Sequence, residues 1–154
     1  MKLTIAVLLL VLTSLSSSAQ EIPKDWKVTL ERPGCFGNCP DYKITIAANG
    51  DVCFRGRDGK ETGRLSKQEV EGLYKMSKTE EFLNLKPGYV PEQECDGPNE
   101  TDWPTEVISL TANGKSRTLT HNVGCKARPD TFLNGIVKLG EAIDELTDSL
   151  FIKN

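Results

Sequence analysis

Two cysteines four positions apart are the residues of this chain best suited to covalent chemistry. Cys35 and Cys39 have three residues between them, whereas a redox dithiol usually has two. No histidine is close in sequence, and only Arg32 or Lys43 is near enough to lower a thiol pKa. We therefore favour a structural disulfide over a redox pair. A zinc site is less favoured still, because zinc needs four ligands.

Three further cysteines complete the set of five. Cys95 and Cys125 flank a predicted hairpin, so they form the natural second pair, and Cys53 is then the free thiol. In the chain-entropy model, a bridge that closes a loop of about 30 residues contributes about 3–4 kcal/mol. The Cys35–Cys39 bridge closes a much shorter loop, so we expect it to shape the chain locally more than to stabilise it.

A long acidic loop is predicted over residues 87–105, with four prolines and no lysine or arginine. Loops of this length are usually functional or held in place by a restraint, and a disulfide at Cys95 would provide that restraint. Carboxylates suit a calcium ion, yet their spacing is not that of a helix-loop-helix calcium site. A solvated loop is favoured, and we expect neither a metal nor a cofactor. The carboxylates are Glu92, Glu94, Asp96, Glu100 and Asp102.

His121 is the only histidine, and no hydrolase or zinc motif surrounds it. A loop or strand-end position is the simpler interpretation of this residue. Side chains of the two loops could instead form a recognition surface, although core packing is the default for the aromatic ones. The residues of this candidate surface are Phe36, Asn38, Asp41, Tyr89, Asp102 and Trp103.

The first residues have the layout of a secretory signal peptide. Lys2 precedes an apolar run over residues 3–12, and small residues follow as far as Ala19. The run is about ten residues long, whereas a bilayer span needs about twenty. We therefore expect cleavage after Ala19, no membrane anchor after signal removal, a periplasmic or secreted location and one domain over residues 20–154. The net charge of −3, with no basic run, argues against nucleic acid as a partner.

Alternating apolar and polar residues predict strands over residues 26–32, 42–47, 52–55, 106–111 and 115–120. A three-residue loop that ends at Gly50 would pair Ile46 with Val52 and Ile44 with Phe54, which gathers the apolar residues on one face. Cys53 would then share the opposite face with Lys43, Thr45 and Arg55. The polar, glycine-rich residues 55–64 predict a loop or a frayed strand end.

Two helix starts are predicted. Ser66 and Glu69 form a capping box, and Asp130 is the expected cap of a helix with one apolar stripe from Phe132 to Leu150. Residues 44–50 match residues 108–114 at an offset of 64, which also separates Ser66 from Asp130. The sequence therefore predicts an α+β domain: an antiparallel sheet of four or five strands with two main helices on one face. A ββα-ββα internal repeat and a coincidence of common hairpins both remain open.

Residues 32–42 resemble a family of small exported bacterial proteins classed only as a domain of unknown function. The family pattern Arg-x-x-Cys-Phe-Gly-x-Cys-Pro-x-Tyr matches from Arg32 to Tyr42, and a looser Thr-Asp-x-Pro-Thr pattern matches residues 101–105. The resemblance covers about residues 26–147, and it implies export and no established activity. We hypothesise that Asp102 accepts hydrogen bonds from the cysteine loop.

Three functional interpretations follow. The favoured one is a non-catalytic exported domain that binds a protein or envelope component through the cysteine loop and the 87–105 loop, because no catalytic constellation is found. The second is a thiol-disulfide redox protein that uses Cys35 and Cys39. The third is an ion-binding or hydrolytic protein centred on the acidic loop.

Overall fold

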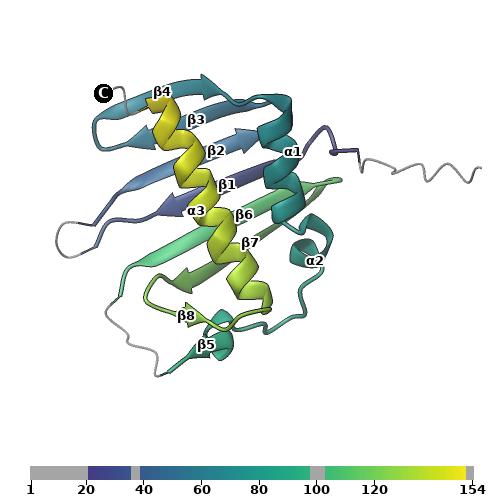
Figure 1. The fold of residues 1–154 in the computed structure, drawn as a ribbon, viewed down its shortest axis with the longest axis vertical. Helices are drawn as coiled ribbons and strands as arrows, with labels where there is room; N and C mark the ends of the chain where they lie inside the picture. Colours follow the sequence, from purple (N-terminus) through teal and green to yellow (C-terminus); the bar gives the residue numbers. More distant parts are fainter. Residues whose placement is uncertain (1–20, 36–38, 98–102, 152–154) are drawn as a thin grey trace, which may run out of the picture.

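Six antiparallel strands form the main sheet. The computed structural model describes residues 21–35, 39–97 and 103–151, and it orders the strands β4-β3-β2-β1-β6-β7 (Figure 1). A second, two-stranded sheet pairs β5 (Cys95–Asp96) with β8 (Lys126–Ala127). The strands of the main sheet are β1 (Lys27–Arg32), β2 (Tyr42–Ala47), β3 (Asp51–Gly56), β4 (Gly59–Arg64), β6 (Thr105–Ala112) and β7 (Lys115–Asn122).

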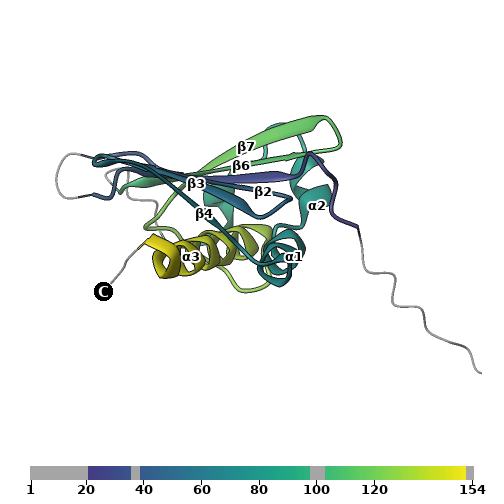
Figure 2. The ribbon, with the colours of Figure 1, turned by 90° about the horizontal axis from the view of Figure 1, so that it is seen from above.

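All the helices lie on one face of this sheet. Figure 2 shows α1 (Lys67–Met76), α2 (Thr79–Leu83) and α3 (Phe132–Phe151) on the same side of the strands. The sheet residues below them are apolar and almost fully buried: Val28, Leu30, Ile44, Ile46, Val52, Ile108 and Leu110. Burial of this face is the main source of stability, at about 1.5–3 kcal/mol for each large side chain. The predicted α+β architecture, with the main helices on one face, is confirmed.

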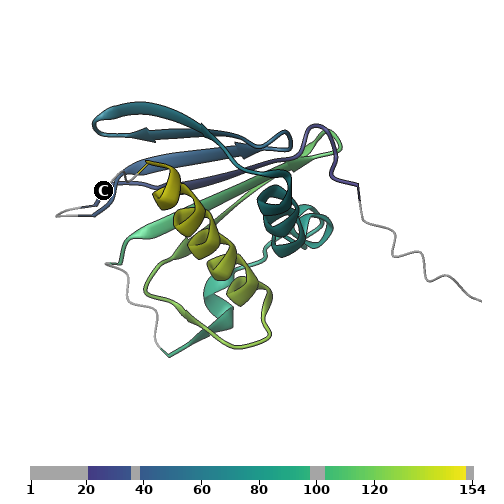
Figure 3. The ribbon, with the colours of Figure 1, turned by 45° about the horizontal axis from the view of Figure 1, so that its top comes forward.

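The longest helix, α3, crosses the sheet diagonally. It begins near β8 and ends near β4 (Figures 1 and 3). Its apolar stripe repeats every three or four residues, as expected for a helix with one buried side. Phe132, Ile136, Leu139 and Ile143 are buried. Because of the diagonal path, the last turns of α3 reach the strand pair β2–β3, and its middle turns reach β1 and β6.

The predicted register of the first hairpin is confirmed. Ile44 pairs with Phe54 and Ile46 with Val52, and Gly50 has a φ of 88° in the loop between the strands. The second hairpin is different, because a two-residue turn of Asn113 and Gly114 joins Ala112 to Lys115. Since the two turns differ, the internal repeat stays a prediction.

Two local predictions were wrong. Residues 55–64 were expected to form a loop or a frayed strand end, but residues 59–64 form the paired edge strand β4, and the sheet therefore has six strands instead of four or five. The cap of α3 is Thr131 and not Asp130, because the Thr131 hydroxyl accepts a hydrogen bond from the amide of Asn134 at 3.2 Å. The capping box of Ser66 and Glu69 is present as predicted.

Candidate functional site

One end of the sheet carries a row of polar side chains under α3. The register of β1, β2, β6 and β7 places Tyr42, Arg32, Glu106 and His121 side by side in successive strands. These residues are in phase with the apolar positions of their strands, so they face the helices. Polar groups in such a position need partners within the fold, since burial without hydrogen bonds is costly.

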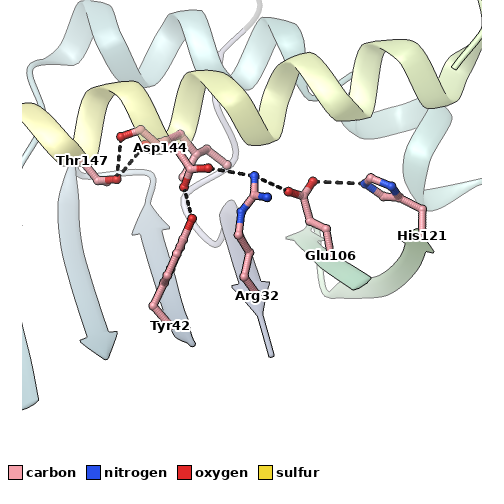
Figure 4. A network of polar contacts seen from close by, with 7 residues as sticks. Arg32, Tyr42, Glu106, His121, Asp144 and Thr147 are labelled. Carbon is pink, nitrogen blue, oxygen red and sulfur yellow. Dashed lines mark hydrogen bonds and ion pairs between the residues drawn. The ribbon is translucent and has the colours of Figure 1, made fainter. Parts of the chain in front are cut away.

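Arg32 joins the two carboxylates of this site. Its Nη2 atom lies 2.7 Å from Oε2 of Glu106 and 2.8 Å from Oδ2 of Asp144 on α3 (Figure 4). The Glu106 side chain is only 4% exposed, compared with 18% for Arg32 and 25% for Asp144. A carboxylate as buried as Glu106 depends on its ion pair, because an unpaired buried charge is strongly destabilising.

Tyr42, on β2, is the neighbour of Arg32 in this row and contacts the same helix residue. Its hydroxyl donates to Oδ1 of Asp144 at 2.6 Å, so Arg32 and Tyr42 contact different oxygens of one carboxylate. Burial raises the pKa of Asp144, and this effect outweighs the Tyr42 hydrogen bond and the Arg32 charge, which lower it. Burial also raises the pKa of the Tyr42 hydroxyl, which therefore remains a proton donor.

His121, on β7, is the last residue of the row and contacts Glu106. Its Nε2 atom lies 3.1 Å from Oε1 of Glu106, and its Nδ1 atom lies 3.3 Å from the carbonyl oxygen of Asn122. The side chain is 3% exposed. The histidine is therefore at a strand end, but it is buried, and both ring nitrogens already face oxygen atoms of the protein.

Gly140 lets α3 approach this row closely. A Cβ atom at this position would lie 2.6 Å from Oε1 of Glu106, and Gly140 is buried in the middle of α3. A glycine inside a helix costs about 0.5–1 kcal/mol relative to alanine. Contact between the helix backbone and the buried carboxylate is the physical reason for a glycine here.

The disulfide-closed loop lies directly beyond Arg32 and Tyr42. Cys35 and Cys39 are bonded, with 5.5 Å between their Cα atoms, and they lie between β1 and β2. Arg32 and Tyr42 pair across these two strands, so they form the base of the loop. The contacts of Arg32 and Tyr42 with Asp144 thus attach the base of the loop to α3. The Cys35–Cys39 disulfide closes the loop itself.

The second predicted disulfide is also present. Cys95 and Cys125 are bonded, so η1 (Pro91–Glu94) and β5 are held against the segment after β7. Arg128 adds hydrogen bonds from its guanidinium to the carbonyl oxygens of Cys95 and Gln93, at 3.1 and 3.0 Å. Cys53 is the cysteine outside both pairs, and it lies half-buried on β3.

A family model for a domain of unknown function (DUF6438) matches residues 26–146 of the chain. The chain belongs to this family. No curated protein sequence matches it significantly. The match extends from β1 into α3, so it contains both disulfides and the five residues that we call the polar network: Arg32, Tyr42, Glu106, His121 and Asp144.

The candidate surface residues of the DUF6438 domain have different environments. Asp41 is exposed beside the cysteine loop, and Trp103 is 49% exposed and packs over Gly124. Tyr89 is half-buried against Phe132, away from the cysteine loop. Phe36, Asn38 and Asp102 lie outside the described residues, as does the hypothesised contact of Asp102 with the cysteine loop.

Sequence reasoning missed Glu106 and Asp144 and did not connect them with Arg32 and His121. One signal was available, because Glu106 and Arg32 occupy apolar-phase positions of their strands, two residues from Ile108 and Leu30.

Within the described residues, no cluster of three or more potential metal ligands is found. No described helix is long and apolar enough to cross a membrane.

Proposed function

We propose that this DUF6438 chain is a non-catalytic, exported domain that binds a protein or envelope component through the cysteine loop and the 87–105 loop. The observation that carries the proposal is the attachment of the cysteine loop at its base. Arg32 and Tyr42 both contact Asp144, and the Cys35–Cys39 bond closes the loop above them. A loop whose base is fixed in this way loses less entropy on binding than a loop with free ends, which favours affinity.

The two loops also emerge at the same end of the sheet. β1 and β6 are antiparallel neighbours, so the end of β1 that leads into the cysteine loop adjoins the start of β6, which follows Trp103 and Pro104 (Figure 1). The Cys95–Cys125 bond restrains β5, which belongs to the 87–105 loop. One partner surface can therefore contact both loops.

A redox role for Cys35 and Cys39 is less well supported, because the nearby cations have other partners. A reactive thiolate needs a neighbouring positive charge. Arg32 is paired with Glu106 and Asp144, and Nζ of Lys43 lies 2.8 Å from Oε2 of Glu31.

A hydrolase based on His121 is disfavoured by the burial of its ring, since a general base must reach the substrate.

Both disulfides are compatible with an oxidising compartment, and this supports export to the periplasm or the exterior.

The test of loop-mediated binding is site-specific photo-crosslinking in cells that produce the protein. A photoreactive residue replaces Asp41 or Trp103 in the loops, or Lys75 on the exposed side of α1 as a matched control. We expect adducts of defined mass from the two loop positions and none from Lys75. The absence of loop-specific adducts would contradict the proposal.

A further inference from the structure

The face of the sheet opposite the helices is open and polar. Figure 2 shows no helix on this side, and no described segment packs over it. Alternate residues of all six strands point toward this face, and Val107 is its only large apolar side chain. Among its charged residues, five are basic and two are acidic: Lys27, Lys43, Arg55, Lys60 and Arg64 against Glu31 and Asp51. The face is therefore positive although the chain as a whole has a net charge of −3.

A row of short polar side chains, five with hydroxyl groups and one with a thiol, crosses the middle of this face. The strand registers align one short polar side chain from each strand: Thr62, Cys53, Thr45, Thr29, Ser109 and Thr118. The hydroxyls of Ser109 and Thr118 lie 2.8 Å apart, and those of Thr29 and Thr45 lie 3.4 Å apart. A hydroxyl has one donor and two acceptor positions, so the accessible hydroxyls of this row retain capacity for a ligand, whereas Thr29 is buried.

The neighbouring row is basic. Lys60 pairs with Arg55 across β4 and β3, and Arg55 pairs with Lys43 across β3 and β2. Like charges in directly opposite positions destabilise a sheet. Glu31 forms an ion pair with Lys43, but no described residue does so with Arg55 or Lys60. The fold therefore places two adjacent cations together without neutralising them.

A hollow marks the end of the basic row. It has a volume of about 160 Å³ and is lined by Lys43, Arg55 and Arg57 together with Glu31 and Asp41. Glu31 pairs with Lys43, and Asp41 lies 3.7 Å from Arg57, so Arg55 is the cation of this hollow for which the described part of the chain provides no counter-ion. A planar guanidinium binds a carboxylate through two parallel hydrogen bonds.

We propose that the open face binds an acidic polysaccharide, with Arg55 and Lys60 on its carboxylates and the hydroxyl row on its sugar hydroxyls. The combination of charge and a hydroxyl row distinguishes this ligand from other polyanions. Single-stranded nucleic acids need aromatic side chains for stacking, and this face has none. A membrane surface needs large apolar side chains for insertion, and Val107 alone does not supply them. This binding surface lies on the strands and adjoins the cysteine loop at Asp41, which also lines the hollow.

The test is binding of the purified protein to carboxylate-bearing oligosaccharides of polygalacturonate, measured by fluorescence anisotropy at low and at physiological salt. The variant R55Q/K60Q removes two adjacent cations for which no ion pair is found among the described residues. The matched control is K75Q/K138Q, which removes the same charge from exposed positions of α1 and α3. Neutral dextran, polyphosphate and duplex DNA are the comparison ligands.

We expect the wild-type protein and K75Q/K138Q to bind the oligosaccharides with affinities that fall as salt increases. We expect R55Q/K60Q to bind at least about tenfold more weakly, since each charged hydrogen bond contributes about 1.5–3 kcal/mol. Equal binding by the two double variants would place the ligand elsewhere and overturn the proposal. The proposal also fails if the oligosaccharides do not bind, or if polyphosphate or DNA binds as tightly. The crosslinks expected above from Trp103 are independent of each of these results, because Trp103 does not line the hollow.

Discussion

Arg32 and Tyr42 face each other across β1 and β2 at the base of the disulfide-closed loop. Each donates a hydrogen bond to a different oxygen of the Asp144 carboxylate, at 2.8 and 2.6 Å. The helix that covers the core thus also holds the two strands where they enter the loop. Stability of the core and geometry of the loop are therefore coupled through one partly buried cluster.

Removal of the Arg32 charge tests this coupling. We expect Arg32→Gln to lower the free energy of unfolding by about 3 kcal/mol or more, because Glu106 would remain buried without a counter-ion. Urea unfolding followed by circular dichroism measures the change. The matched control is Arg57→Gln, whose ion pair with Asp41 is exposed and long at 3.7 Å. Such pairs contribute about 0–1 kcal/mol. Similar losses in both variants would show that the buried pair has no special role.

Gly140 gives a test of the helix contact. We expect Gly140→Ala to destabilise the protein by about 1–3 kcal/mol, because the added methyl group would collide with Glu106. Gly72 is the control, since it lies in α1 with open space around its Cβ position. Gly72→Ala should stabilise the protein by about 0.5–1 kcal/mol. Thermal unfolding of both variants compares them directly, and stabilisation by both would contradict the close contact at Gly140.

Asp25 makes stability depend on pH. Hydrogen bonds from the backbone amides of Gly114 and Asn113 lower the pKa of its carboxyl group. A lowered folded-state pKa stabilises the protein above the ordinary aspartate pKa, and this contribution is lost as the pH falls through the folded-state value. We expect Asp25→Ala to have a lower Tm than wild type at pH 7. The difference should shrink below about pH 3.9, the ordinary aspartate value.

The variant Asp25→Asn separates charge from hydrogen bonding in the same experiment. It retains one acceptor oxygen for the turn of β6 and β7, so its loss of Tm at pH 7 should be smaller than that of Asp25→Ala. A difference between wild type and Asp25→Ala that is constant from pH 7 to pH 2 would contradict the role of the ionised carboxylate.

The two disulfides should contribute unequally to stability. Their cysteines are 30 and 4 residues apart in sequence. In the chain-entropy model, the longer loop corresponds to about 3–4 kcal/mol. We expect C95S/C125S to lose about this amount, and C35S/C39S to lose less because the polar network still holds the base of its loop. Denaturant midpoints of the two double variants test the order, and a larger loss in C35S/C39S would contradict it.

The sequence predicted the parts of the fold that have a local signal. The register of β2 and β3 followed from Gly50 and from the alternation of Ile44 and Ile46 with polar residues. The capping box at Ser66 is likewise a short-range pattern. β4 has no such pattern, because its residues are nearly all polar and its conformation depends on pairing with β3. Edge strands of this kind are difficult to distinguish from loops in a single sequence.

The polar network was harder to predict because it is made of distant residues. Arg32, Glu106 and Asp144 come from three elements that only the folded sheet and the diagonal path of α3 bring together. His121 was placed at a strand end, but its burial depends on Glu106 in the neighbouring strand. Each residue alone looks like an ordinary charge on a half-exposed element. The decisive information is the pairing of β1 with β6, which follows a connection of more than seventy residues.

The central claim is that the loop between β1 and β2 is a braced, non-catalytic element. Alkylation of the folded protein, with and without a mild reductant and followed by peptide mass mapping, tests it most directly. We predict that Cys53 alone is modified in both conditions, while Cys35 and Cys39 remain bonded to each other and Cys95 to Cys125. Rapid reduction and alkylation of Cys35 and Cys39 while the protein stays folded would contradict the claim and support a redox function.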